Sequence, residues 1–72
     1  MYAKYKIKLI TLKEAEELMA MFDDEDLGMY MPLELFLWKE GDKWIAMDNT
    51  DGNAWIEEFS ARWKAERWLV GA

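Results

Sequence analysis

The residues of this 72-residue chain that could do chemistry are mainly carboxylates. Asp and Glu number 15 against 9 Lys and Arg, for a net charge of -6, and the sequence contains no Cys and no His. Without Cys the chain has no thiolate nucleophile and no thiolate metal ligand, and without His it lacks the usual general base. The pair Glu57 and Glu58 lies in a predicted strand, where neighbours point to opposite faces, so it cannot act as an acid–base dyad. We expect no enzyme activity, because no nucleophile, base and orienting group occur together.

A second chemistry open to carboxylates is metal binding, and residues 48–53 are superficially like a calcium loop. An EF-hand loop needs Gly at its position 6 and Glu at its position 12. If the loop starts at Asp48, Gly52 falls at position 5 and Phe59 at position 12, so the pattern fails. The segment is instead predicted to be a turn whose Asp and Asn side chains bond the local backbone. We expect neither a metal nor a cofactor.

The remaining chemistry is electrostatic binding through clustered acids. Residues 14–58 hold fourteen acids against Lys39 and Lys43, which leaves -12 in this part of the chain. Such a body repels phosphate, so we expect no direct binding of nucleic acid, whereas a protein with a basic surface is attracted. Clustered acids usually form only a solvated surface. The more specific alternative is that these acids imitate the spacing of DNA phosphates. The acids expected to contact a partner are Glu14, Glu17, Asp23, Asp24, Glu25 and Asp26.

Aromatic residues are the expected anchors of such a contact. The sequence has five Trp, and we predict that three of them mainly build the core that so short a chain needs. Trp63 lies off the apolar stripe of its predicted helix, between Arg62 and Lys64, and is predicted to be exposed. An exposed Trp beside Arg is typical of an interface hot spot. Tyr30, in a predicted loop, is the second aromatic residue expected to contact the partner.

The elements that must position these residues follow from the hydrophobic pattern. Residues 4–10 alternate between apolar and basic side chains, which predicts a half-buried strand. Thr11 and Glu14 match a capping box, and a helix is predicted over 12–22. The acidic run 23–26 ends this helix, since acids at a helix C-terminus oppose the helix dipole.

The second half of the chain is predicted to contain three strands and a helix. Gly41 and Asp42 form a two-residue turn between strands over 33–40 and 43–48. This turn predicts the facing pairs Glu40–Lys43, Lys39–Trp44, Trp38–Ile45, Leu37–Ala46, Phe36–Met47 and Leu35–Asp48. The remaining elements are a turn over 49–53, a strand over 54–59, and a helix over 61–70 with Ser60 as its N-cap and Gly71 after its end.

The order β-α-β-β-β-α predicts an α+β fold, in which an antiparallel sheet has both helices packed on one face. The whole chain, residues 1–72, is predicted to form a single small domain. Both faces of the hairpin over 33–48 are apolar, and two helices on one face leave the other open. We expect the loop over 23–32, a second copy or a partner to cover it. The register of the last strand stays open, so either Trp55 or Ile56 points to the helices.

The sequence contains no membrane signal. No stretch approaches the about 20 apolar residues that cross a bilayer, and the N-terminus lacks the apolar segment of a signal peptide. The absence of Cys fits a reducing compartment. We therefore expect a cytoplasmic protein without membrane contact.

A resemblance becomes visible in residues 42–59, which read DKWIAMDNTDGNAWIEEF. This segment resembles a pattern in small uncharacterised proteins of bacteriophages and prophages. The pattern has an aromatic-apolar pair, Ala, an apolar residue, Asp-Asn, a Gly turn, Trp-x-Glu-Glu-Phe and a helix that ends near Trp-Leu, here Trp68 and Leu69. The resemblance covers about residues 41–69, and it departs in the first turn of the last helix, which is usually acidic but is basic and aromatic here over 61–64. It implies a bacteriophage origin and a bacterial host cell, and no chemistry.

These observations predict a binding protein encoded by a phage. By analogy with acidic anti-CRISPR inhibitors, we expect it to inhibit a host nucleic-acid-binding defence or replication protein through an acidic surface that partly mimics DNA. An alternative is an oligomeric sponge that sequesters a nucleotide immune signal near Trp63 and Trp68. Its phosphate contacts would be Lys4, Lys6, Lys8, Arg62, Lys64 and Arg67. A third hypothesis is a structural or accessory phage homodimer.

Overall fold

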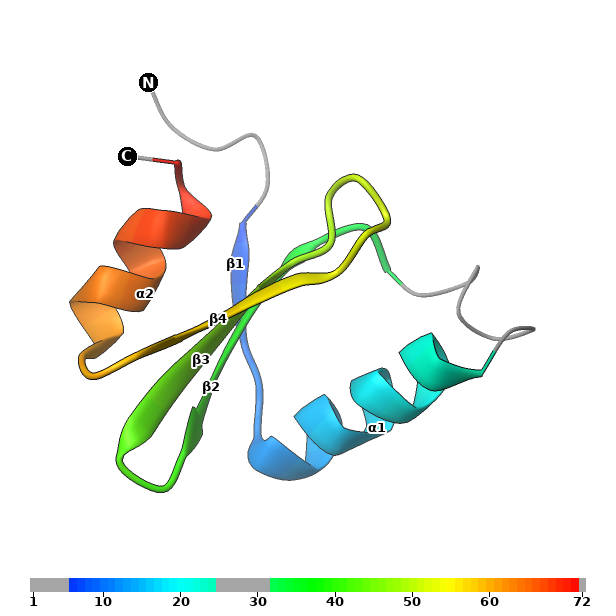
Figure 1. Ribbon diagram of the computed structural model, residues 1–72, viewed down its shortest axis with the longest axis horizontal. Coiled ribbons are helices and arrows are strands. Elements are labelled where there is room, and N and C mark those ends of the chain that lie inside the picture. Colours follow the sequence, from blue (N-terminus) through cyan, green and yellow to red (C-terminus); the bar gives the residue numbers. More distant parts are fainter. Residues whose placement is uncertain (1–5, 25–31, 72) are drawn as a thin grey trace.

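The computed structural model describes residues 6–24 and 32–71 (Figure 1). Its elements are β1 (Ile7–Leu9), α1 (Leu12–Asp23), β2 (Leu35–Glu40), β3 (Lys43–Asp48), β4 (Trp55–Phe59) and α2 (Arg62–Leu69). The predicted element order and the α+β class are confirmed, since two helices accompany one four-stranded sheet in the order β1-β2-β3-β4. No helix in the described ranges is both long enough and apolar enough to cross a membrane.

The prediction of a purely antiparallel sheet is wrong, because β1 is parallel to β2, with Ile7 opposite Leu35 and Leu9 opposite Leu37. The two strands lie on either side of α1 in the chain, and a helical crossover returns the chain in the same direction. α1 begins at the predicted capping box. Thr11 Oγ1 accepts a hydrogen bond from the Glu14 N–H at 3.1 Å, and the Thr11 N–H donates to Glu14 Oε1 at 2.9 Å.

The β2–β3 hairpin has the predicted register at all six pairs, from Glu40–Lys43 to Leu35–Asp48. Its turn contains Gly41 at φ +63°, a conformation that glycine adopts without strain. β4 is antiparallel to β3 and places Ile56 opposite Met47 and Trp55 opposite Asp48. Residues that face each other across strands share a face, so this register settles the orientation that the sequence left open.

The two helices lie on opposite faces of the sheet, which corrects the prediction that both pack on one face (Figure 1). On one face, Ala15 of α1 packs with the sheet residues Phe36, Trp38, Ile45 and Met47. On the other, Ala65 and Leu69 of α2 pack with Leu35, Leu37 and Ala46. Because successive strand residues alternate between faces, a hairpin covered by one helix on each side must be apolar on both.

This arrangement removes the reason for expecting a second copy or a partner over the hairpin, since α2 covers the second face. A homodimer remains a prediction without that support. The predicted N-cap of the last helix is also wrong: Ala61 occupies the cap, without a side-chain hydrogen bond, and α2 begins at Arg62. Gly71 ends the helix as predicted, at φ +75° and with its N–H donating to the Trp68 carbonyl at 3.1 Å.

Candidate functional site

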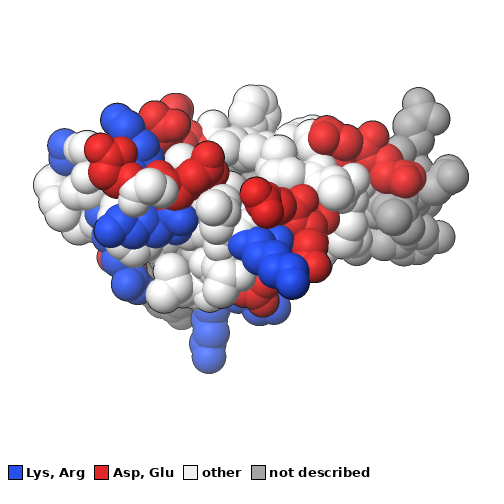
Figure 2. Space-filling model, turned by 90° about the horizontal axis from the view of Figure 1, so that it is seen from below, with Lys and Arg blue, Asp and Glu red and all other residues white. Residues whose placement is uncertain are grey.

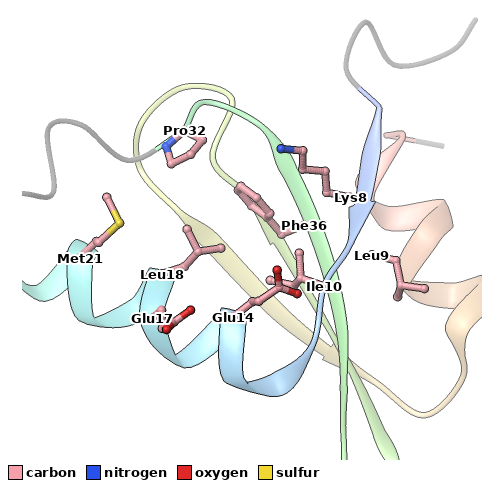
Figure 3. Close-up of a pocket in the computed structure, with 9 residues that line it drawn as sticks. All are labelled: Lys8, Leu9, Ile10, Glu14, Glu17, Leu18, Met21, Pro32 and Phe36. Atoms are coloured by element: carbon pink, nitrogen blue, oxygen red, sulfur yellow. The ribbon is translucent and has the colours of Figure 1, made fainter.

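A groove of about 530 Å³ lies between α1 and the β1–β2 side of the sheet (Figure 3). Leu18 of α1 and Phe36 of β2 point into the space between helix and sheet, whereas Leu9 points away from it. The floor is apolar and the rim is charged. The lining residues are Lys8, Leu9, Ile10, Glu14, Glu17, Leu18, Met21, Pro32 and Phe36.

The groove brings together Glu14 and Glu17, two of the acids predicted to contact a partner. They lie three residues apart on α1, which places them on neighbouring turns of one helix face. The backbone N–H of Thr11 donates to the Glu14 carboxylate and lowers its pKa from the ordinary value. Glu14 is therefore committed to the helix cap, and Glu17 is the groove acid without a hydrogen bond or ion pair among the described residues.

The cation at the rim of this groove already has a partner. Lys8 Nζ lies 3.3 Å from Glu34 Oε2, and both side chains are partly exposed. An exposed ion pair of this kind contributes little to stability, but the Glu34 carboxylate offsets the positive charge of Lys8 at the rim. The groove therefore presents an apolar floor next to net negative charge.

A second, smaller groove of about 320 Å³ lies against α1 and contains the predicted contact residue Asp23. Its apolar lining comes from α1 and from Trp38 of β2. Its carboxylates are Glu16, Asp23 and Glu40. Asp24, another predicted contact residue, caps the C-terminus of α1, so the acids extend beyond both grooves to the end of the helix.

Charge differs between the two helices. α1 has one Lys against four acids, a net -3, whereas α2 has three cations against Glu66, a net +2. Figure 2 shows Asp and Glu dominating the right-hand part of the surface, where α1 lies, and mixed charges to the left. Since the helices cover opposite faces, the net negative charge of α1 and the net positive charge of α2 lie on opposite sides of the sheet.

Trp63 is exposed as predicted, at 59%, but it lies on α2 and not beside the acids of α1. Lys64 Nζ lies 5.7 Å from the centre of its ring. The predicted site is therefore divided between two faces of the molecule. Three of its residues, Glu25, Asp26 and Tyr30, lie outside the described residues.

The prediction that three of the five Trp residues are mainly core agrees with the structure. Trp38 is buried, and the half-buried Trp44 and Trp68 pack against the α2-side core. Arg62 and Lys39 lie 5.5 and 5.8 Å from the centre of the Trp44 ring. Sequence reasoning did not identify Trp55, which is 59% exposed at the start of β4. The signal it lacked was the register of that strand.

The arrangement is suited to binding. The described residues contain no group of three or more His, Cys, Asp or Glu side chains placed to hold a metal ion. No family model, curated protein or solved structure matched the chain.

Proposed function

We propose that this chain is a non-enzymatic binding protein that engages a basic protein surface through the acidic grooves along α1. One observation carries the proposal: Glu17 lies at the rim of a groove whose floor contains Leu18 and Phe36. A Lys or Arg side chain has a long apolar stem and a charged end, and this combination matches an apolar floor beside a carboxylate. A guanidinium group would pair with Glu17 while its stem lies on the half-buried Leu18.

The acids on the rest of α1 would add attraction at a distance. Glu16 and Asp23 line the second groove, and Asp24 follows the end of the helix. Surface charges of one sign raise the association rate of an oppositely charged partner, and this effect weakens as salt rises. We propose that α1 meets the partner first, because α2 on the opposite face carries the cations.

The identity of the partner rests on the resemblance of residues 42–59 to small phage proteins. On that basis we propose a host nucleic-acid-binding protein, such as a CRISPR nuclease or a replication factor, as the target. Carboxylates along α1 would occupy its phosphate-binding groove, where DNA presents one charge per about 1.7 Å. We propose that the complex forms in the cytoplasm of the bacterial host.

The experiment is a pull-down from bacterial lysate followed by binding measurements on the purified partner. Glu17→Lys is expected to weaken the complex about tenfold at low salt, and the difference should shrink as salt rises. The matched control is Asp42→Lys, which makes the same change in net charge at the exposed turn between β2 and β3. Equal effects of the two substitutions would mean that net charge, and not the groove, determines binding.

The nucleotide sponge remains a second candidate, favoured by the exposed ring of Trp63 beside Lys64. A nucleobase can stack on an exposed indole while nearby cations contact phosphate. A cyclic dinucleotide would then quench Trp fluorescence in the wild type and in Trp55→Ala, but not in Trp63→Ala. Quenching that is insensitive to Trp63 would refute this placement.

A further inference from the structure

The outer edge of β4 is open. β4 is the last strand of the sheet and pairs with β3 on one side. Within residues 6–24 and 32–71, no backbone hydrogen bond joins Trp55–Phe59 to a strand on the other side. A free strand edge presents a row of N–H and C=O groups that can pair with another extended chain.

Two apolar side chains flank this edge, one on each face of the sheet. Trp55 is 59% exposed on the face that carries α2, and Ile56 is 42% exposed on the face that carries α1. α2 contacts the opposite end of the strand, where Trp68 lies 6.0 Å from Phe59 between ring centres. The first half of β4 is therefore left without a covering helix.

Trp55 is held in its exposed position. Its Nε1–H donates to Asp51 Oδ2 at 3.1 Å, and this hydrogen bond is the main cause of the lowered pKa of Asp51. A large aromatic side chain that is fixed before binding loses little conformational freedom when a partner docks. Trp55 thus has the properties of a preorganised anchor.

The second half of the strand carries charge. Glu57 and Glu58 are exposed on opposite faces, and neither has an ion-pair partner among the described residues. In a symmetric antiparallel pair of β4 strands centred on Glu57, this residue would face its own copy, which is unfavourable. Carboxylates at this edge therefore disfavour that pairing with a second copy and favour a cationic segment.

We propose that the β4 edge binds an extended segment of a basic partner by strand addition. In the antiparallel orientation, two consecutive Lys or Arg residues would lie opposite Glu58 and Glu57, and two consecutive apolar residues would follow opposite Ile56 and Trp55. Backbone hydrogen bonds would supply affinity, and the side-chain pairs would supply specificity. The inference rests on the proposed function, because the partner is the same basic protein, but it uses none of the residues of the α1 grooves.

The test uses two synthetic peptides that differ only at the charged pair. One contains Lys-Arg-Val-Ile between Ser and Thr residues, and the other contains Glu-Asp-Val-Ile in the same frame. The basic peptide is expected to slow amide hydrogen exchange in Trp55–Phe59 and not in Ile7–Leu9, the other edge of the sheet. The acidic peptide should have no effect.

The chain variant for this test is Glu57→Lys combined with Glu58→Lys, at two exposed positions, where a substitution usually changes stability only slightly. It should bind the basic peptide about tenfold more weakly and bind the acidic peptide detectably. Asp42→Lys, at the exposed turn between β2 and β3, is the control for added positive charge and should leave peptide binding unchanged. Protection of Trp55–Phe59 by the basic peptide tests the β4 edge alone, and the effect of Glu17→Lys on the partner complex tests the α1 groove, so the two failures are distinguished. Unchanged affinity in the double variant, protection at β1, or protection of β4 by a second copy without peptide would each overturn the inference.

Discussion

Replacement of Asn49 should destabilise the protein more than any other single polar change near the β3–β4 turn. Its side chain is 1% exposed, and both of its polar atoms are hydrogen-bonded: Nδ2 donates to the Pro32 carbonyl at 2.8 Å, and Oδ1 accepts from the Ala54 N–H at 2.9 Å. Its backbone N–H donates to the Glu34 carbonyl at 3.0 Å. One residue thus ties the start of β2 to the turn that leads into β4.

The cost of Asn49→Ala follows from the two groups it leaves without partners. A buried donor or acceptor without a hydrogen bond costs about 1–3 kcal/mol. Pro32 is only half-buried, so we expect a total near 3 kcal/mol. A 72-residue domain has roughly 4–11 kcal/mol of stability at about 0.05–0.15 kcal/mol per residue, so this loss is a large fraction.

The assay is urea unfolding followed by Trp fluorescence. With a slope of about 1 kcal/mol per molar urea, the midpoint of Asn49→Ala should fall by about 3 M. The control is Asn53→Ala, in the same turn but exposed, for which we expect about 0.5 kcal/mol or less. Asn49→Asp keeps the acceptor for Ala54 and loses the donor to Pro32, and its deficit should shrink at low pH, where a protonated carboxyl can donate. Equal losses for the two alanine variants would refute the reasoning.

Two further substitutions test single contacts. Trp38 is 4% exposed and its Nε1–H has no acceptor among the described residues, so Trp38→Phe removes an unsatisfied donor along with part of the ring. We expect urea unfolding to place it within about 1 kcal/mol of the wild type, and a loss above about 2 kcal/mol would show that the N–H is bonded. The pKa of Glu14 is lowered by its bond to Thr11, so its ionised form stabilises the fold above the ordinary pKa of 4.5, and this stability is lost as pH falls through the lowered pKa. The stability difference between the wild type and Glu14→Gln should therefore be larger at pH 7 than at about pH 3, and a constant difference would contradict the assignment.

The parts of the fold that could be predicted from the sequence are those with local signals. Thr11 and Glu14 form a capping box that spans four residues. Gly41 and Asp42 form the two-residue turn that determines the register of the β2–β3 hairpin. In both cases, the residues that determine the local structure are adjacent in the sequence to the helix or strands that they position. The register of β4 was not predictable in the same way, because it depends on Asn49 bonding to Ala54 and to the distant Pro32.

The arrangement of the layers depended on contacts far apart in the sequence. The sequence showed that both faces of the hairpin are apolar. In the structure this pattern corresponds to one helix on each face, and not to two helices on one face with the other face open. The α1 groove was hidden for the same reason, since Glu17 and Phe36 line one groove only after α1 packs beside β1 and β2. The acids of α1 could be named from the sequence, whereas the apolar floor beside them could not.

The placement of acidic α1 and basic α2 on opposite faces makes the molecule an electric dipole across the sheet. Packed layers are about 10 Å apart, so the two charged layers are separated by roughly 20 Å. The Debye length is about 8 Å at physiological ionic strength, and a protein close to α1 therefore experiences the acids there with little influence from the cations of α2. At about 0.01 M salt the Debye length reaches about 30 Å, and the same protein experiences the field of the whole molecule. Salt thus changes which charges an approaching partner senses, and the torque that turns α1 towards a cationic surface extends farther from the molecule in dilute buffer.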